Sequence, residues 1–584
     1  MRVIYTMRDH EKIVFFMAFI VIVLSVGAEA GVQVTVEGVS GPMLKNVLAY
    51  LSIEQQKNHP DLSEGLIRKL HERAADEIRS ALRPFGYYMP GIQVDLSGND
   101  SLWHVRYKID PGEPVRITRV DFRMTGPGAE DESFQTLSEN FPVREGDVLE
   151  DAVYEKAKRT LQELAEKRGY LDAELIEHRV DVTLEDKSAV IHLHMDTGPR
   201  YHFGDVTIHQ EVFRPEFISR FVHLERGDPY TLDALYHLQN DLNDSDYFDR
   251  VDIKAGRDQA EGVEVPVDVT LEHRKRDKYT AGVGYGTDTG VRGSLGWENR
   301  WVNSWGHKMN AELRLSEIKN SVTTRYVVPL KNPTTDHLDY TAGWFNERTD
   351  TSSSETYLMG VSHIHIRNEW KQTVYINYQE ERFTVGDQDG RSNLLLPGIS
   401  WARVKADNRI YTTRGYRLFF DIRGAHKTLL SDASFIQARV QTKLIHGVGE
   451  SGRIILRGDG GATRVDKFSD LPASVRFFAG GDQSVRGYAY NTLGPTNDAG
   501  DVVGGKYLLV GSAEYEHIMV GKWSAAVFYD IGNAIDNFSD PYKKGAGFGI
   551  RWKSPVGLIR CDLASGISDP GHPWRLHLTI GPDL

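Results

Sequence analysis

The second half of the chain alternates apolar with polar or small residues and shows almost no helical periodicity. Strands are predicted over residues 279–286 and 575–580, near the two ends of this region. The apolar faces carry Tyr279, Ala281 and Val283 on the first strand and Leu576, Leu578 and Ile580 on the second, while Gly282 and Gly284 lie on the small face of the first. Such two-faced strands are typical of a closed membrane β-barrel, although a soluble sandwich or barrel gives the same alternation.

The length of this region fits a large barrel over residues 276–584. Residues 278–584 number 307. Shared among sixteen strands, they give about 19 residues each, enough for a tilted strand of about 10 residues with its turn or loop. The spacing therefore fits sixteen antiparallel transmembrane strands. Trp297, Trp301, Trp305 and Trp344 are candidates for an aromatic belt at the membrane surface.

The part before the barrel repeats a helix-then-strand pattern three times. The predicted units are residues 31–113, 114–199 and 200–275. In the first unit the expected order is strand, helix, helix, strand, strand. A Gly-Asp pair stands shortly before the main helix of the second unit, at 146–147, and of the third, at 227–228. Internal duplication explains this agreement better than chance does, so three α+β repeats are predicted.

The first thirty residues match a secretory signal peptide. A charged start with Arg2, Arg8 and Lys12 precedes an apolar run of 14 residues, 13–26. Small residues follow at 28–30, as they do at a signal cleavage site. A membrane anchor is the alternative, but the run is shorter than the ~20 residues that a spanning helix needs. We therefore expect residues 1–30 to direct export of the chain.

Composition narrows the classes of function. Beyond residue 30 there is no comparable apolar stretch and the mean hydropathy is -0.41, which argues against a helical membrane protein and leaves a barrel open. Cys561 is the only cysteine, so no internal disulfide can form. The formal net charge of -13 implies no basic surface that would neutralise phosphates, and nucleic-acid binding is not expected.

A glycine-rich loop with one arginine stands out among the predicted strands. Residues 477–490 read FFAGGDQSVRGYAY, and the arginine, Arg486, needs a counter-charge. Asp530 and Glu514 each lie on the less apolar face of a strand downstream, so both are candidate partners. Further lumenal candidates are Arg560 and Asp562. Such a pair could pin the loop inside the barrel, whereas a solvated salt bridge in a wet lumen contributes roughly 0 to 1 kcal/mol.

Other patterns with known chemistry do not fit their usual context. The glycine runs at 282–286 and 545–549 alternate within strands, whereas a phosphate-binding loop needs a strand before it and a helix after it. Two histidine pairs could share a strand face and ligate a metal, but neither has a visible third ligand; they are His192 with His194 and His363 with His365. No nucleophile-and-base signature is present. We therefore expect no catalytic residues, no metal, no cofactor and no enzyme activity.

Five short motifs in the barrel region point to a known family. They are Val485-Arg486-Gly487-Tyr488, Gly511-Ser512-Ala513-Glu514, Phe528-Tyr529-Asp530-Ile531-Gly532, Trp552-Lys553-Ser554-Pro555-Val556-Gly557 and Gly581-Pro582-Asp583-Leu584. Together they resemble the outer-membrane assembly superfamily that includes BamA and TamA, and most closely the TamA family. Three repeats discriminate within the superfamily, because BamA-like proteins carry five and two-partner secretion transporters two. In this superfamily the repeats are called POTRA domains.

The resemblance implies three POTRA domains in the periplasm and a 16-stranded barrel in the cell outer membrane, with the loop that carries Arg486 folded into the lumen. It implies that the protein inserts or translocates other outer-membrane proteins, notably autotransporters. The implied partners are these clients, membrane lipid and TamB, a long protein anchored in the inner membrane. The last residue, Leu584, departs from barrels that end in an aromatic residue, which bears on recognition by the assembly machinery rather than on the family.

The predicted mechanism places client strands at the seam between the first and last strands of the barrel. Glycines in strand 279–286 are expected to weaken its pairing with strand 575–580, so that the seam opens sideways and its edge templates a client strand. One alternative is a secretion pore that passes clients through the lumen. Another is a passive uptake channel or surface receptor, in which the repeats serve only as a scaffold.

Overall fold

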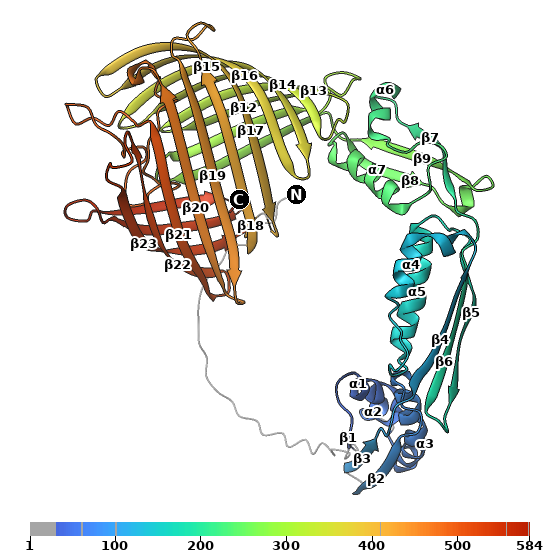
Figure 1. Ribbon diagram of the computed structural model, residues 1–584. Helices are drawn as coiled ribbons and strands as arrows, with labels where there is room; N and C mark the ends of the chain where they lie inside the picture. The colour runs from blue at the N-terminus through green and yellow to red at the C-terminus, as the bar shows by residue number, and fades with distance from the viewer. Residues whose placement is uncertain (1–30, 60–61, 100–101, 409, 556, 582) are drawn as a thin grey trace, which may run out of the picture. The chain divides into compact units, whose positions relative to one another are not determined.

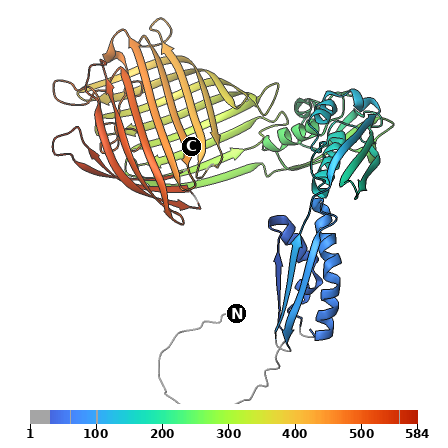
Figure 2. The same ribbon diagram turned by 60° about the horizontal axis from the view of Figure 1, so that its bottom comes forward.

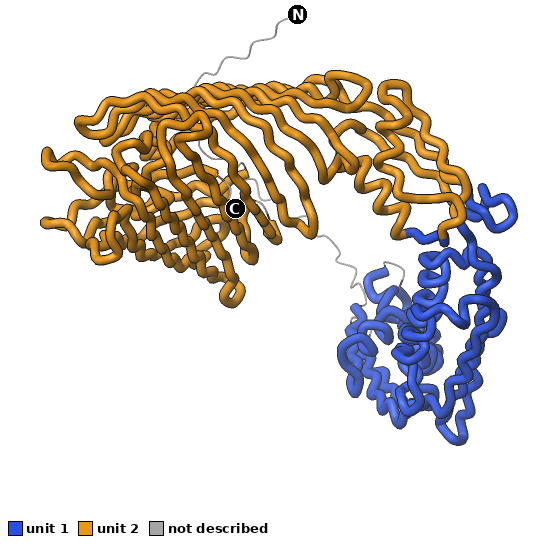
Figure 3. The backbone as a smooth tube through the Cα atoms, turned by 45° about the horizontal axis from the view of Figure 1, so that its top comes forward, with its two compact units in different colours: residues 1–202, 229–232, 256–265 blue, residues 203–228, 233–255, 266–584 orange. Residues whose placement is uncertain are grey.

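The structure, a computed structural model, describes residues 31–59, 62–99, 102–408, 410–555, 557–581 and 583–584 (Figure 1). The predicted signal peptide, residues 1–30, lies outside the described residues. The chain divides into two compact units, which Figure 3 colours separately. The first holds residues up to 202 with 229–232 and 256–265, and the second holds 203–228, 233–255 and 266–584. Most of the third repeat therefore belongs to the same unit as the barrel.

The first repeat is a three-stranded sheet covered by helices. Its elements are β1 (Gly31–Glu37), α1 (Gly41–Tyr50), α2 (Ser52–Gln56), α3 (Glu64–Leu82), β2 (Gly91–Asn99) and β3 (Leu102–Asp110), with strand order β1-β3-β2. Residues of β3 alternate between buried and exposed, so Val105 and Tyr107 face the core. There they join Ile67 and Ile78, two residues of the buried stripe of α3. The predicted order is confirmed, with α2 as an addition.

The second and third repeats have the same topology. The second contains β4 (Arg116–Thr125), α4 (Glu132–Glu139), α5 (Asp151–Lys167), β5 (Glu174–Thr183) and β6 (Ser188–Asp196), in strand order β4-β6-β5. The third contains β7 (His202–His209), α6 (Pro215–Ile218), α7 (Leu232–Asp244), β8 (Phe248–Lys254) and β9 (Glu264–His273), in strand order β7-β9-β8. The prediction had one main helix in each of these repeats and omitted α4 and α6, which are too short to show a helical period.

Single turns of 3-10 helix complete the described helical elements. They are η1 (Arg83–Phe85), η2 (Pro127–Glu130), η3 (Ser219–Phe221), η4 (Arg257–Gln259) and η5 (Phe468–Asp470). None of the helices in the described residues combines the length and the apolar composition of a membrane-spanning helix.

The remaining strands form one closed barrel in which each strand pairs with its neighbours in the chain (Figures 1 and 2). They are β10 (Asp277–Gly286), β11 (Gly290–Asn299), β12 (Lys308–Ser316), β13 (Lys319–Pro329), β14 (Asp336–Arg348), β15 (Ser352–Arg367), β16 (Trp370–Val385), β17 (Gln388–Ala406), β18 (Arg414–Ala425), β19 (Phe435–Val448), β20 (Gly452–Val465), β21 (Tyr507–Val520), β22 (Trp523–Ile535), β23 (Lys543–Ser554), β24 (Gly557–Gly566) and β25 (Trp574–Gly581). The predicted fold class, three α+β repeats followed by a closed 16-stranded antiparallel barrel, is confirmed.

The barrel strands have an apolar outer face and a more polar inner face. On β22, Val527 and Tyr529 are exposed on the outside, while Phe528 and Asp530, which alternate with them, are buried on the inside. Strand length varies around the barrel: β17 has 19 residues, whereas β25, the last strand, has only 8. The barrel is therefore closed by one of its shortest strands.

Candidate functional site: the lumenal loop and the barrel seam

The loop between β20 and β21, residues 466–506, packs against the inner wall of the barrel. Val485 is fully buried and Tyr488 is nearly so, and both belong to an apolar cluster with residues of β21 and β22. Gly487 has a φ of 93°, and a Cβ at this position would lie 2.7 Å from the backbone nitrogen of Gly566 in β24. The glycine of the predicted loop motif is thus required both by its backbone conformation and by the close approach.

Arg486 anchors this loop. Its Nε and Nη2 donate to the two carboxylate oxygens of Asp530 at 2.8 and 2.9 Å, which makes a bidentate pair. Its Nη1 donates to Oε2 of Glu514 at 2.7 Å. The guanidinium also lies over the ring of Phe528, 3.4 Å from the centroid. The structure thus brings Arg486 together with both carboxylates that the sequence offered as its partners.

Three arginines and three carboxylates form one buried lumenal cluster around this contact. Its members are Arg457, Arg486, Arg551, Glu514, Asp530 and Asp562. Arg551 donates to Glu514 at 2.7 Å, and Arg457 lies 3.7 Å from Asp530. The formal charges cancel, so each ion has a counter-ion in a site that water hardly reaches. Removing one partner of such a network leaves an uncompensated buried charge, which costs about 3 to 5 kcal/mol.

Sequence reasoning missed two members of the lumenal cluster. Arg551 alternates with Phe548, Ile550 and Trp552 along β23, so strand periodicity was sufficient to place it in the lumen. Arg457 stands in β20 before the glycines of residues 458–461, where few side chains show an apolar outer face. The sequence pattern alone therefore did not place Arg457 on the inner face of the barrel.

A second set of polar contacts joins the loop to both strands beside the seam. Asp482 of the loop accepts from Nδ1 of His577 on β25 at 2.5 Å, and from the hydroxyl of Thr287, after β10, at 3.1 Å. The other ring nitrogen of His577 accepts the backbone N–H of Gly487 at 2.9 Å. The backbone N–H of Asp482 in turn donates to Asp288 at 2.5 Å. The loop therefore bridges the two sides of the seam from within.

Asp288, Asp482 and His577 are also the one group of three potential metal ligands within the described parts of the chain. Both nitrogens of His577 are engaged, because Nε2 accepts an N–H and Nδ1 donates to Asp482. The arrangement is thus a hydrogen-bonded link without a free imidazole lone pair for a metal.

In the predicted histidine pairs, His192 lies beside Asp181 and His363 beside Asp336. Burial, reinforced by the charge of Asp482, raises the pKa of Asp288 to about 6.

The end of the chain is anchored inside the barrel. The buried carboxylate of Asp583 accepts from Nη1 of Arg453 and from Nη2 of Arg560, each at 2.6 Å. It also accepts the backbone N–H of Thr412 at 3.0 Å. Arg453 is paired with Glu516 at 2.6 Å as well. The sequence assigned no binding role to Asp583, because this residue follows the last alternating strand and has no periodic signal.

β10 and β25 pair over fewer residues than the sequence predicted. The strands meet at one residue pair, Gly286 with Thr579, whereas β10 faces β11 along its whole length. The predicted seam residues of β10 therefore have no partner on β25; they are Tyr279, Ala281, Gly282, Val283 and Gly284. Val283, on the outer face, is 96% exposed, because its partner on β11 is Gly293 and no strand lies on its other side. The predicted seam residues of β25 pair with β24; they are Leu576, Leu578 and Ile580. The backbone N–H of Leu578 also donates across the seam to the hydroxyl of Thr287 at 3.1 Å.

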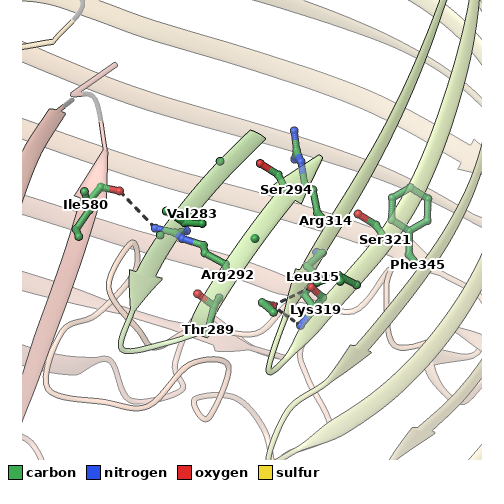
Figure 4. Close-up of a pocket in the computed structure, with 14 residues that line it drawn as sticks. Val283, Thr289, Arg292, Ser294, Arg314, Leu315, Lys319, Ser321, Phe345 and Ile580 are labelled. Atoms are coloured by element: carbon green, nitrogen blue, oxygen red, sulfur yellow. Dashed lines mark hydrogen bonds between the residues drawn. The ribbon is translucent and has the colours of Figure 1, made fainter. Parts of the chain in front are cut away.

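A pocket of about 510 Å³ lies beside this gap (Figure 4). It is lined by residues of the first strands of the barrel and by Ile580 of β25. Arg292 of β11 reaches across the gap, and its Nη2 donates to the carbonyl of Ile580 at 3.4 Å. Near the single residue pair, the backbone N–H of Thr287 also donates to the carbonyl of Leu578 at 3.2 Å. The junction thus has a few isolated hydrogen bonds where other strand junctions have a continuous backbone ladder.

Both the barrel and the repeats match known protein families. Residues 275–582, which are more than half of the chain, match the model of the Omp85 superfamily domain. The chain belongs to the Omp85 superfamily. Residues 33–111 match the POTRA domain described as TamA domain 1, and residues 120–197 and 201–272 match the POTRA model described as surface antigen variable number repeat. This Omp85 protein is thus an outer-membrane β-barrel with three N-terminal POTRA domains in the periplasm.

The relatives of this Omp85 protein include BamA proteins. The outer membrane protein assembly factor BamA of Nitratidesulfovibrio vulgaris is 25% identical over 403 residues, which cover 63% of this chain and 49% of the relative. The BamA of Neisseria meningitidis serogroup B is 23% identical over 452 residues, covering 65% and 56%. The chain thus spans about half the length of the curated relatives it matches. The crystal structure of BamA from Haemophilus ducreyi lacking POTRA domains 1–3 has a TM-score of 0.67 at 15% identity, and the match covers 80% of this chain and 99% of that one. This likeness shows a shared fold.

The substitution Arg486→Ala tests whether the lumenal cluster stabilises the barrel. It leaves Asp530 with only the more distant Arg457 and Glu514 with only Arg551, so we expect a loss of about 3 to 5 kcal/mol in the free energy of unfolding. The measurement is the temperature at which purified full-length protein in detergent changes from its folded to its unfolded mobility on a gel. Arg464→Ala, which removes an exposed arginine of β20, should leave this temperature almost unchanged. An equal shift in the two variants would show that the cluster does not stabilise the barrel.

Proposed function

We propose that this Omp85 protein inserts or translocates other outer-membrane proteins, autotransporters among them, by pairing a client strand with β10. The observation that carries the proposal is the free edge of β10, residues 277–285, which has β11 on one side and no strand on the other. In hydrocarbon each unpaired backbone group costs several kcal/mol. A client strand that pairs with this edge satisfies those groups, so no nucleotide is needed at the site.

The side chains of β10 suit many client sequences. Its outer face is apolar, with Tyr279 and Val283 both exposed. Its inner face has no side chain at Gly282 and Gly284, which lie next to Ser294 and Arg292 of β11. Recognition at such an edge relies on backbone hydrogen bonds, which are the same for every client strand. This favours a factor that serves a class of proteins over a receptor for one ligand.

The lumen supports a route through the wall rather than along the barrel axis. The loop of residues 466–506 occupies the lumen and is fixed by the lumenal cluster and by the contacts of Asp482. Passage of a client along the axis would require these buried ion pairs to separate first. Pairing of a client strand with the free edge of β10 does not require these ion pairs to separate. These contacts therefore favour lateral insertion over a secretion pore.

The first POTRA domain supports a finer proposal, that this protein is a TamA-like factor with a TamB-like partner anchored in the inner membrane. The match to TamA domain 1 covers residues 33–111, nearly the whole of the first repeat. Its sheet ends in two edge strands, β1 and β2. An extended partner or client segment can pair with such an edge by the same backbone contacts that we assign to β10.

Site-specific photocrosslinking tests the free edge of β10. A photoreactive amino acid at Val283 should capture autotransporter strands during assembly, because this position faces the gap. The matched control is Val322, an exposed apolar position on β13, which is paired on both sides. Crosslinks should be several-fold more frequent at Val283. Equal capture at the two positions would mean that clients meet the outer wall without preference for the seam.

A reversible lock separates lateral insertion from the secretion pore. In a Cys561→Ser background, cysteines replace the one pair that joins β10 to β25, as Gly286→Cys with Thr579→Cys. Oxidation should reduce client insertion at least tenfold, and a reductant should restore it, because a client strand that pairs along residues 277–285 enters the barrel wall only if β25 moves away from β10. The control pair Thr341→Cys with Gly360→Cys locks a continuous ladder and should have no effect. Unchanged assembly with the seam locked would favour the pore, and normal autotransporter levels without this protein would favour a passive channel.

A further inference from the structure

A pocket at the end of the barrel that borders the third POTRA domain takes no part in the proposed mechanism. Two cavities of about 460 and 520 Å³ share Arg220 and Lys331 as lining residues. Arg220 belongs to η3 of the POTRA domain, and Lys331 to the turn between β13 and β14. Both lie in the second compact unit, where α6 stands beside the end of β13 (Figure 1). The two cavities together are called the rim pocket below.

Arg220 is held by contacts that leave two of its nitrogens, Nε and Nη2, available as donors. Its Nη1 donates to the carbonyls of Pro329 and Leu330 at 3.2 and 3.1 Å. The guanidinium also lies over the ring of Trp305, 5.7 Å from the centroid. Within the described residues, its Nε and Nη2 have no hydrogen-bond partner. A guanidinium fixed in this way presents a planar fork of donors, which matches the oxygens of a phosphate group.

The lining of the rim pocket carries a net positive charge, from Arg220 and Lys331 against Asp336. The residues around the first cavity include no carboxylate; they are Arg220, Trp305, His307, Val328, Pro329, Leu330 and Lys331. Lys331 is exposed, and its ammonium has no ion-pair partner in the described part of the chain. Asp336 lines the second cavity but is engaged by His363 at 2.6 Å. An anionic ligand in the first cavity would therefore meet two cations that have no ion-pair partner among the described residues.

One wall of the rim pocket continues the lipid-facing surface. Val328 and Leu330 follow the exposed Val322 at a period of two along β13 and into the turn, which keeps them on the outer face. Trp305 adds an aromatic ring of the kind found at the level of lipid headgroups. The POTRA domains attach at this end of the barrel, so the rim faces the periplasm. Arg220 and Lys331 thus stand at the boundary between the headgroups and the acyl chains.

We propose that the rim pocket binds the phosphodiester headgroup of a glycerophospholipid from the periplasmic leaflet. The phosphate oxygens accept from Nε and Nη2 of Arg220 and from the ammonium of Lys331. The acyl chains then run along Val328 and Leu330, which a free anion would leave uncovered. Because Arg220 comes from the POTRA domain and Lys331 from the barrel, the bound lipid fastens one to the other at the membrane surface.

Native mass spectrometry of the delipidated full-length protein tests this site with dioleoylphosphatidylglycerol as the probe. We expect one tightly held lipid per chain, with its occupancy at least threefold lower in Lys331→Gln. The matched control is Lys522→Gln, which removes an exposed lysine from the turn between β21 and β22 on the same rim. This control should retain the lipid as the unmodified protein does.

A second variant and a second probe complete the test. Arg220→Gln, with its folded state checked by gel mobility before boiling, should lower the occupancy at least as far as Lys331→Gln. Inorganic phosphate in millimolar excess should displace little lipid, because it lacks the acyl chains. Equal lipid occupancy in all variants would overturn the proposal. Complete displacement by inorganic phosphate would overturn it as well, since the pocket would then be an anion site without preference for lipid.

Discussion

The structure depends on one constraint: backbone N–H and C=O groups that face hydrocarbon must be paired within the protein. Fifteen of the sixteen strand junctions satisfy it with antiparallel ladders, and the junction between β10 and β25 has a single residue pair. The unpaired edge of β10 is therefore the position at which the bilayer favours the arrival of another strand. A client that forms β structure removes the same penalty for itself, so both partners gain from the pairing.

The last strand, β25, is held by its ladder to β24 and by contacts inside the lumen, although it has no ladder to β10. The lumenal cluster fixes the loop through Arg486, and the loop holds β25 through Asp482 and His577. The end of the chain is held separately, by Asp583 between Arg453 and Arg560. These contacts withdraw the last residues from the edge of β10. Apart from the contacts at Gly286 and Thr287, the barrel is thus closed by side chains in the lumen, and the backbone of β10 over residues 277–285 remains available.

The sequence predicted the repeats, the barrel and the partners of Arg486 because each has a periodic or charge-based signal. Strand alternation placed Asp530 and Glu514 on inner faces, and the same argument would have placed Arg551 there. Two features had no such signal. Asp583 lies beyond the last strand, and its partners are distant in the sequence. The number of residue pairs between β10 and β25 depends on where these contacts hold the end of the chain. Residues with opposite charges show that pairing is possible, but only the fold determines which of them meet.

Hydrogen exchange of the full-length protein in lipid nanodiscs tests the central claim most directly. On β10, amides of residues 277–285 that point toward the gap have no partner, whereas amides on β13 and β14 belong to continuous ladders. The account predicts that about half of the β10 amides exchange orders of magnitude faster than those of β13 and β14. Uniform protection of β10, equal to that of its neighbours, would show that the edge is paired in the membrane and would contradict the account.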